Sequence, residues 1–397
     1  MEMSEHTVPL SNRTVYLSLI IGTGGLTFFG IVPIVLGALI TSGRINAAEL
    51  GYIATAETIF TAVGMLLGLR ALRSFGGRWA IVVAGIVMAL ANIAIEFLSN
   101  FGLIISAGSM AGLAQGVLVA VVCLSIGCSL NPARTSGIFL AVSVPPPLLL
   151  AYFLPSYLMP RFGNGAGLSA LAVVGLVSSA CALFIREDFC GTSAANRKHV
   201  DWTPLTIAAL LGILLSSAGY GAAWAYVDLL GANHGLKSQE IGFALSVAIA
   251  GQFLVSALIG AIGWRLPTLK ILLAVSALQT LIPILLQESG SLPGFTLLLT
   301  GFALMWQGAT PFATELLAAL DDSRRLAPLA LPLQLAGLAL GPLVVAPVAQ
   351  ASLSLILLIA SGFYGLTLIA YIVVLVGRGA SDTASMNSLE ADAPGSV

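Results

Sequence analysis

The sequence has few charged residues, and this scarcity decides its class. Asp, Glu, Lys and Arg together make up 8% of the 397 residues, whereas hydrophobic residues make up 58%. The mean hydropathy is +1.02. A soluble globular domain carries roughly 25% charged residues, and a protein this apolar could not cover its own surface with polar groups. The chain must therefore face lipid over most of its area.

Motifs for catalysis, metal binding and nucleic-acid binding are also missing. No Walker pattern and no His-Glu-x-x-His sequence occurs, and the glycine-rich run at 22–25 does not fit Gly-x-Gly-x-x-Gly. The three histidines lie outside the interiors of the apolar segments, and the net charge of -1 comes with no basic patch. The sequence therefore predicts no enzyme, no cofactor, no metal site and no nucleic-acid partner. The four cysteines form no Cys-x-x-Cys pair and are interpreted as small apolar side chains; they are Cys123, Cys128, Cys181 and Cys190.

Long apolar runs fill most of the chain. A helix needs about 20 apolar residues to cross the hydrocarbon core of a bilayer, and twelve segments meet this requirement. The sequence therefore predicts an all-α membrane protein with twelve transmembrane helices. The predicted spans are approximately 14–40, 50–70, 79–98, 103–127, 137–159, 166–185, 204–230, 241–263, 270–287, 294–319, 326–349 and 353–376.

The basic residues predict the orientation of these spans. If the N-terminal segment 1–13 is cytoplasmic, 13 of the 16 Lys and Arg residues fall on the cytoplasmic side, and only Arg44, Arg161 and Lys237 fall outside. Cytoplasmic loops of membrane proteins carry such an excess. Both termini are therefore predicted to be cytoplasmic, in a multi-pass protein of the cell or inner membrane. The C-terminal segment 377–397 is rich in Ser, Ala, Asp and Gly, and we expect it to be disordered.

A weak internal repeat relates the two halves of the chain. Several residues recur after 191 positions, or after 192 in one case, and the shift joins spans 1–6 to spans 7–12. Six spans per half give both halves the same orientation. The sequence thus predicts two six-helix bundles, 14–185 and 204–376, joined by a cytoplasmic linker, 186–203. The matched pairs are Glu49 with Glu240, Gly51 with Gly242, Gln115 with Gln307, Arg134 with Arg325 and Phe29 with Tyr220.

With these features, the chain resembles the major facilitator superfamily of secondary transporters over essentially its whole length. The loop between spans 2 and 3 also resembles a motif of that family, in which a glycine is followed by an Asp-Arg pair and then by Gly and Arg. Gly68 and Arg73 match in place, Gly77 and Arg78 match after a shift, and Leu72 replaces the acid. The resemblance implies a loop that takes part in conformational change, although the missing acid weakens the usual charge relay.

The resemblance also implies a substrate site near the midplane, between halves that rock to expose it alternately to each side. In that family, spans 1, 4, 7 and 10 line the cavity. Span 7 carries Tyr220 and Trp224 four residues apart, on one helical face, although core packing or an interfacial aromatic belt also explains such residues. The candidate substrate-binding residues are Phe28, Phe29, Gln115, Tyr220, Trp224, Trp306 and Gln307.

Glu57 is the leading candidate for coupling to protons. It lies inside span 2, and placing a carboxylate there costs roughly 2.5–3.5 kcal/mol, which marks it as functional by default. Thr61 and Gly64 share its face, so this face is expected to meet protein rather than lipid. Burial disfavours the charged carboxylate, so the group could take up and release a proton. The alternative is a structural hydrogen bond to a neighbouring helix.

Glu315, in the last third of span 10, is the second candidate for proton coupling. Its proximity in sequence to Arg324 and Arg325 offers another interpretation, a structural ion pair at the cytoplasmic end. Glu96 and Asp228 lie near the outer ends of their spans, where interfacial solvation explains them. The three prolines at 145–147 must interrupt span 5, and they indicate either a gating bend or a cavity wall.

No Lys or Arg falls in the middle of a predicted span. A carrier of organic anions would need a buried cation, so the sequence predicts a small neutral or cationic organic solute. The leading hypothesis is a monomeric secondary transporter in the lipid bilayer that works by alternating access and is coupled to protons. A membrane receptor or assembly factor on the same scaffold remains an alternative, and it would show no solute flux.

Overall fold

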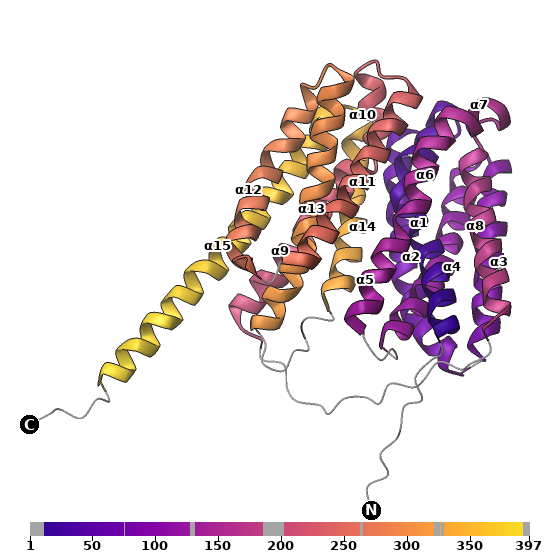
Figure 1. Cartoon of the computed structure of the whole chain (residues 1–397). Coiled ribbons are helices and arrows are strands. Elements are labelled where there is room, and N and C mark those ends of the chain that lie inside the picture. Colours follow the sequence, from indigo (N-terminus) through magenta and orange to yellow (C-terminus); the bar gives the residue numbers. More distant parts are fainter. Residues whose placement is uncertain are drawn as a thin grey trace, which may run out of the picture.

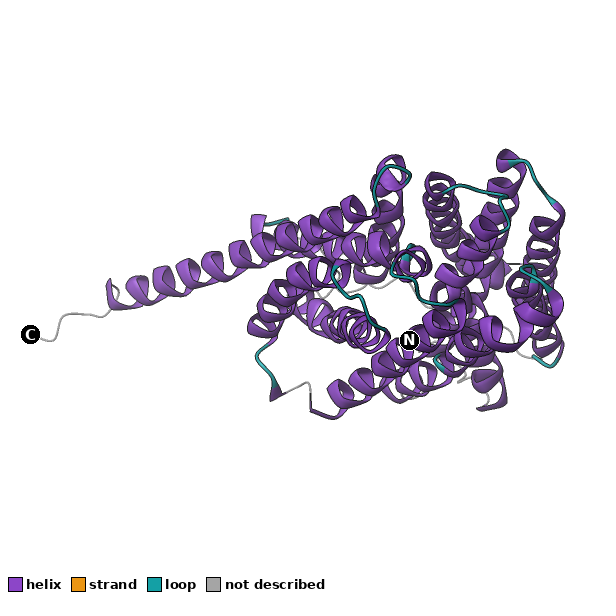
Figure 2. Ribbon diagram, turned by 90° about the horizontal axis from the view of Figure 1, so that it is seen from above, coloured by secondary structure: helices purple, strands orange, loops and turns teal. Residues whose placement is uncertain are grey.

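The computed structural model describes residues 12–74, 76–127, 132–185, 202–262, 265–320, 326 and 329–391. Within these ranges every regular element is a helix, and no strand occurs. The fold class predicted from the sequence, an all-α membrane protein, is therefore confirmed at this level. Figures 1 and 2 show the helices gathered into two bundles that lie side by side, with the earlier helices in one and the later helices in the other.

The first bundle holds the helices that precede residue 186. They are α1 (Asn12–Thr41), α2 (Ala47–Ser74), α3 (Gly77–Phe97), α4 (Phe101–Gly127), α5 (Pro132–Ser143), α6 (Pro145–Phe153), the π-helix η1 (Leu154–Leu158), α7 (Met159–Phe162) and α8 (Ala166–Leu183). The second bundle holds α9 (Pro204–Trp224), α10 (Val227–Asn233), α11 (Ser238–Ile262), α12 (Thr268–Gln287), α13 (Leu292–Leu320), α14 (Ala330–Ala349) and α15 (Leu353–Ala391).

In the described part of the chain, eleven helical segments are long and apolar enough to cross a membrane. Helix α13 is not among them, although it has 29 residues. Polar residues such as Gln307, Thr310 and Glu315 lower its apolar character. Eleven of the twelve predicted spans therefore have a matching helix by this criterion, and the crossing of α13 stays a prediction.

The three prolines interrupt span 5, as predicted. Helix α5 ends at Ser143, and α6 begins with Pro145 in its first turn. Proline has no N–H to donate, and the first turn of a helix is where that loss costs least. The crossing segment Ala141–Phe162 is consequently built from several short pieces. Span 7 is also divided, since α9 ends at Trp224 and α10 starts at Val227.

The C-terminal segment 377–397, for which the sequence predicts disorder, is described up to residue 391. Helix α15 continues without a break to Ala391, and its end projects away from the bundle in Figure 1. The membrane-spanning part of this helix ends at Arg378. No Gly or Pro occurs between Gly379 and Pro394, so nothing in the backbone terminates the helix where the apolar run stops. Residues 392–397, 1–11 and the linker positions 186–201 lie outside the described ranges.

Small residues bring α2 and α4 into backbone contact. A Cβ added to Gly112 would overlap the backbone of Glu57, and one added to Gly116 would overlap that of Thr61. Glycines at a spacing of four predict such close helix packing. The same holds in the second bundle, where a Cβ on Gly341 would overlap the backbone of α9. The tight α2–α4 pair fixes the surroundings of Glu57.

Candidate functional site

A cavity of about 500 Å3 lies between the two bundles. Ligand pockets of about 300–1,000 Å3 are typical for small organic molecules. The lining residues come from α1, α2, α4, α5 and α6 of the first bundle and from α9, α11, α13 and α14 of the second. Neither bundle could form this cavity alone.

The cavity is closed toward one end of the molecule, which we name the far face. The far face is where α1 ends and α2 begins, near α7 and α10 at the top of Figure 1. Between the middle of the bundles and this face, the halves are joined by direct hydrogen bonds. Tyr226 Oη donates to Ala47 O at 3.1 Å, and Thr55 Oγ1 donates to Ala339 O at 2.9 Å. Ser246 Oγ lies 3.3 Å from Leu148 O but donates its proton over the shorter distance of 2.8 Å to Gly242 O of its own helix.

Glycines complete the closure at the far face. A Cβ on Gly37 would overlap the carboxylate of Asp228, and one on Gly242 would overlap Pro155. Both contacts cross from one bundle to the other. Asp228 is thus packed against α1 at the interface of the halves, which differs from the solvated interfacial position expected from the sequence.

The opposite end, where α1 begins, is named the terminal face. Leu331 lines the cavity near the start of α14 and is 43% exposed. Lining residues nearer to the far face are covered, with Ala54 at 4% and Val32 at 6% exposure. This gradient indicates that the cavity opens toward the terminal face.

Four aromatic rings form a stack on the wall contributed by the second bundle. Tyr220 stacks on Trp306 with a centroid distance of 4.1 Å and an interplanar angle of 13°. It also stacks on Trp224 at 5.1 Å and 18°, and on Phe302 at 5.2 Å and 10°. The spacing of four between Tyr220 and Trp224 places both on one face of α9. The aromatic stripe predicted in span 7 therefore faces the cavity.

Glutamine side chains supply much of the polar lining. Gln252 Nε2 donates to Tyr220 Oη at 2.9 Å, and Gln307 Nε2 donates to Ser256 Oγ at 3.2 Å. Gln334 lines the cavity as well. The sequence interpretation missed Gln252, Ser256 and Gln334. An uncharged amide inside an apolar span was the available signal, because such a group needs a partner or water.

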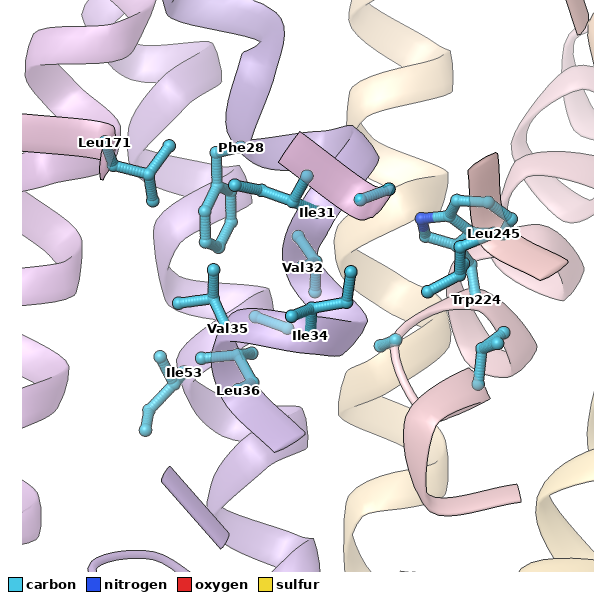
Figure 3. Close-up of a cluster of buried hydrophobic side chains, with 14 of the residues drawn as sticks. Phe28, Ile31, Val32, Ile34, Val35, Leu36, Ile53, Leu171, Trp224 and Leu245 are labelled. Atoms are coloured by element: carbon cyan, nitrogen blue, oxygen red, sulfur yellow. The ribbon is translucent and has the colours of Figure 1, made fainter. Parts of the chain in front are cut away.

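Five of the seven predicted substrate residues line the cavity: Phe29, Tyr220, Trp224, Trp306 and Gln307. Phe28 and Gln115 do not. Phe28 is 2% exposed and lies on the side of α1 near Leu171, away from Trp224 (Figure 3). Successive helical residues point about 100° apart, and here that difference turns Phe28 into the first bundle while Phe29 faces the cavity.

The carbonyl of Phe29 has a partner in the other bundle. In an α-helix this oxygen would accept a hydrogen bond from residue 33, but Pro33 has no N–H. Trp224 Nε1 donates to Phe29 O at 2.9 Å instead. A carbonyl released by proline therefore holds the two halves together at the cavity wall.

A second proline forms part of the wall itself. Pro147 lines the cavity, and its ring lies against Gly30 of α1, where an added Cβ would overlap it. Of the two interpretations left open for the triple proline, the structure supports a cavity wall.

Glu57 is buried in the α2–α4 contact beside the cavity. It is 2% exposed, and its Oε1 accepts a hydrogen bond from Gln115 Nε2 at 2.7 Å. No Lys or Arg in the described residues bonds to it. Gln115 Oε1 is buried and has no hydrogen-bond partner among the described residues. The next residue, Thr58, lines the cavity, so the carboxyl group lies one helical position away from the lining.

Glu315 is in a different environment. It is exposed, and its Oε2 accepts a hydrogen bond from Thr268 Oγ1 of α12 at 2.9 Å. The predicted partners Arg324 and Arg325 lie outside the described residues. Over the ranges that the structure covers, no three His, Cys, Asp or Glu residues gather where a metal could bind.

The predicted loop between spans 2 and 3 falls where α2 ends at Ser74 and α3 begins at Gly77. Gly68 packs against α4, where an added Cβ would overlap Ala120 and Val117. Gly76 has a positive φ of 62° and precedes Gly77, the first residue of α3. The Arg78 guanidinium lies 5.2 Å from the centroid of the Trp79 ring. The side chain of Arg73 lies outside the described part.

No family model and no curated protein matches this sequence. Solved structures do match its fold, at low sequence identity. A mutant of the nucleoside transporter NupG aligns with a TM-score of 0.74 and 12% identity, covering 91% of this chain and 100% of that one. NupG itself gives 0.68 and 12%, covering 92% and 99%. A bacterial homologue of the human lysosomal transporter Spinster, in an inward-facing and unoccupied conformation, gives 0.70 and 13%, covering 91% and 96%.

Proposed function

We propose that this chain, which has the fold of the major facilitator superfamily, is a secondary active transporter of a small neutral or cationic organic solute. One observation carries the proposal. A cavity of about 500 Å3 is shared by two bundles that are joined at the far face, while the lining is exposed toward the terminal face. A site reached from one side only is what alternating access requires of each state.

The pairing of helices supports two equivalent halves. In the first bundle α2 packs on α4, α3 on α8 and α1 on α4. The helices assigned to them by the 191-residue shift pair in the same way: α11 on α13, α12 on α15 and α9 on α13. Between the bundles, α2 on α14 is matched by α11 on α6. This pattern favours α13 as the twelfth span, because it takes the place of α4.

We assign proton coupling to Glu57. A carboxylate buried without a cation is unfavourable, whereas its protonated form is neutral. The protonated group would also gain a donor. Its O–H could bond to Gln115 Oε1, which has no partner in the described part of the chain, while Gln115 Nε2 keeps its bond to Glu57 Oε1. The protonated Glu57 can make both bonds, whereas the carboxylate can only accept and therefore makes one.

Solute flux into liposomes tests the whole proposal. Purified protein would be reconstituted and offered a solute library under an imposed pH gradient, with nucleosides among the first solutes because two neighbours carry that name. We expect uptake driven by the gradient, and its loss in Glu57→Gln. Glu288→Gln, at an exposed position, is the matched control. Flux that does not depend on the pH gradient would contradict proton coupling. Binding of a solute without flux would favour the alternative, a membrane receptor.

The orientation is a separate part of the proposal. With both termini cytoplasmic, the terminal face is the cytoplasmic side, and the cavity opens inward. Reporter fusions at residue 1 and after residue 397 would test this. Reporters on opposite sides of the membrane would contradict both the orientation and an even number of spans.

A further inference from the structure

We propose that the cavity takes an uncharged, flat organic solute whose polar edge carries both a hydrogen-bond donor and an acceptor. Its ring would lie on Trp306, and its edge would be recognised by the amides of Gln307 and Gln334. This inference rests on the proposed function, since it treats the shared cavity as the substrate site. The proposed function allows neutral or cationic solutes, and this inference limits them to neutral ones.

The described lining of the cavity carries no charged side chain. Among the described residues that line it, none is Asp, Glu, Lys, Arg or His. The two carboxylates nearest in sequence to lining residues contact other groups: Glu57 bonds to Gln115, and Asp228 packs on Gly37. An organic ion that entered the cavity would lose its hydration and find no counter-charge there. Burying an unpaired ion in this way is strongly unfavourable.

The stacked rings do not form an aromatic cage for a cation. Such a cage needs several ring faces turned toward one point. Here the rings face one another instead, with interplanar angles of 13° between Tyr220 and Trp306 and 18° between Tyr220 and Trp224. Tyr220 is only 4% exposed, so the faces of its ring are covered by the neighbouring rings and cannot contact a cation.

The partly exposed ring of Trp306 favours a flat solute. Trp306 belongs to the stack but is only half-buried and lines the cavity. Its ring is therefore available to a solute, and aromatic rings prefer offset-parallel or edge-on partners at 4.5–7 Å. A flat solute would extend the existing stack, whereas a branched one would bury less of the Trp306 surface.

The amide groups of the lining favour a solute that carries both a hydrogen-bond donor and an acceptor. Gln307 and Gln252 each donate one bond through Nε2, and within the described residues their Oε1 atoms accept none. Gln334 lines the same space. An amide offers a donor and an acceptor side by side, unlike a carboxylate or an ammonium group. The complementary partner is a neutral edge of the same kind, as in a carboxamide or a heterocyclic lactam.

Matched probes of equal shape and different charge test this directly. We would measure thermal stabilisation of the purified full chain by 2-naphthamide, 2-naphthoate and 2-naphthamidine, and by the same three derivatives of benzene. We expect the neutral amide of each set to bind at least about tenfold more tightly than its charged analogues, because only the ions lack a counter-charge. Equal binding, tighter binding of an ion, or no binding of either amide would overturn the inference.

Substitution of Gln307 sharpens the test. Gln307→Leu should weaken amide binding, whereas Gln307→Glu should shift the preference toward the amidine by placing a carboxylate in the cavity. Gln350→Glu, at the exposed end of α14, is the control and should change nothing. Gel filtration and the unliganded Tm establish folding of each variant. Retention of the wild-type preference in Gln307→Glu would contradict the assigned role of Gln307.

Binding and flux separate the two proposals. Selective binding of the amides without flux in liposomes would support the solute class and contradict transport. Flux of an anionic or cationic solute would support transport and contradict the class.

Discussion

The two bundles have similar helix pairings but contain different chemistry next to the shared cavity. The first places a buried acid, Glu57, between two helices whose backbones touch. The second places stacked rings and amides on the cavity wall. The difference suggests a division of roles, with coupling in the first bundle and solute recognition in the second. Trp224 connects them, since it belongs to the aromatic stack and bonds to Phe29 O across the interface.

The largest effect is expected from blocking closure of the far face. A Cβ on Gly51 would overlap Tyr226 Oη, Pro342 O and the Cβ of Ala346. Gly51→Val should therefore hold the halves apart, since forcing methyl groups into a packed contact costs about 1–3 kcal/mol. Uptake should fall by about tenfold or more, which corresponds to 1.4 kcal/mol. Gly365→Val, where the added group meets open space, is the control and should transport normally.

The second effect sharpens the role of the first bundle. A buried carboxylic acid that keeps its proton in the folded state and loses it on unfolding makes the free energy of unfolding fall as the pH rises above about 4.3, the ordinary pKa of a Glu side chain. Wild-type Tm should thus decrease as the pH rises from about 4 to neutral, and Glu57→Gln should flatten this slope. Thermal melts across pH measure it. An unchanged slope would mean that Glu57 is not the titrating group.

The third effect tests the link between the bundles. Trp224→Phe keeps a ring in the stack but removes the bond to Phe29 O, a loss of about 0.5–1.5 kcal/mol. Pro33→Ala would restore an N–H that can satisfy the same carbonyl within α1. In the Pro33→Ala background, Trp224→Phe should consequently cost less. A double-mutant cycle on unfolding free energies measures the difference, and simple additivity would contradict the link.

The smallest effect is expected at the second predicted acid. Glu315 is exposed and bonded to Thr268, so Glu315→Gln should change stability by less than about 0.5 kcal/mol. It should also leave the pH dependence of uptake unchanged. If Glu315→Gln altered the pH profile of uptake as strongly as Glu57→Gln, both bundles would take part in proton coupling. The proposed division of roles between the bundles would then be wrong.

Several details of the site were predictable from local patterns. Tyr220 and Trp224 share a face because they are four residues apart, and the glycines of α4 predict close packing on α2. Phe28 and Phe29 show the limit, since their adjacent positions point in different directions and the sequence does not say which one meets the cavity. Gln115 shows another limit, because its partner Glu57 is 58 positions away.

The sequence by itself determined that this chain crosses a membrane many times as helices. A backbone surrounded by lipid has no water to bond to, so apolar runs of this length must satisfy their N–H and C=O groups internally. Only the tertiary structure decided which side chains meet across the two halves, such as Trp224 with Phe29 and Asp228 with Gly37. These contacts join residues nearly 200 positions apart, and their geometry depends on how two whole bundles pack rather than on any local pattern.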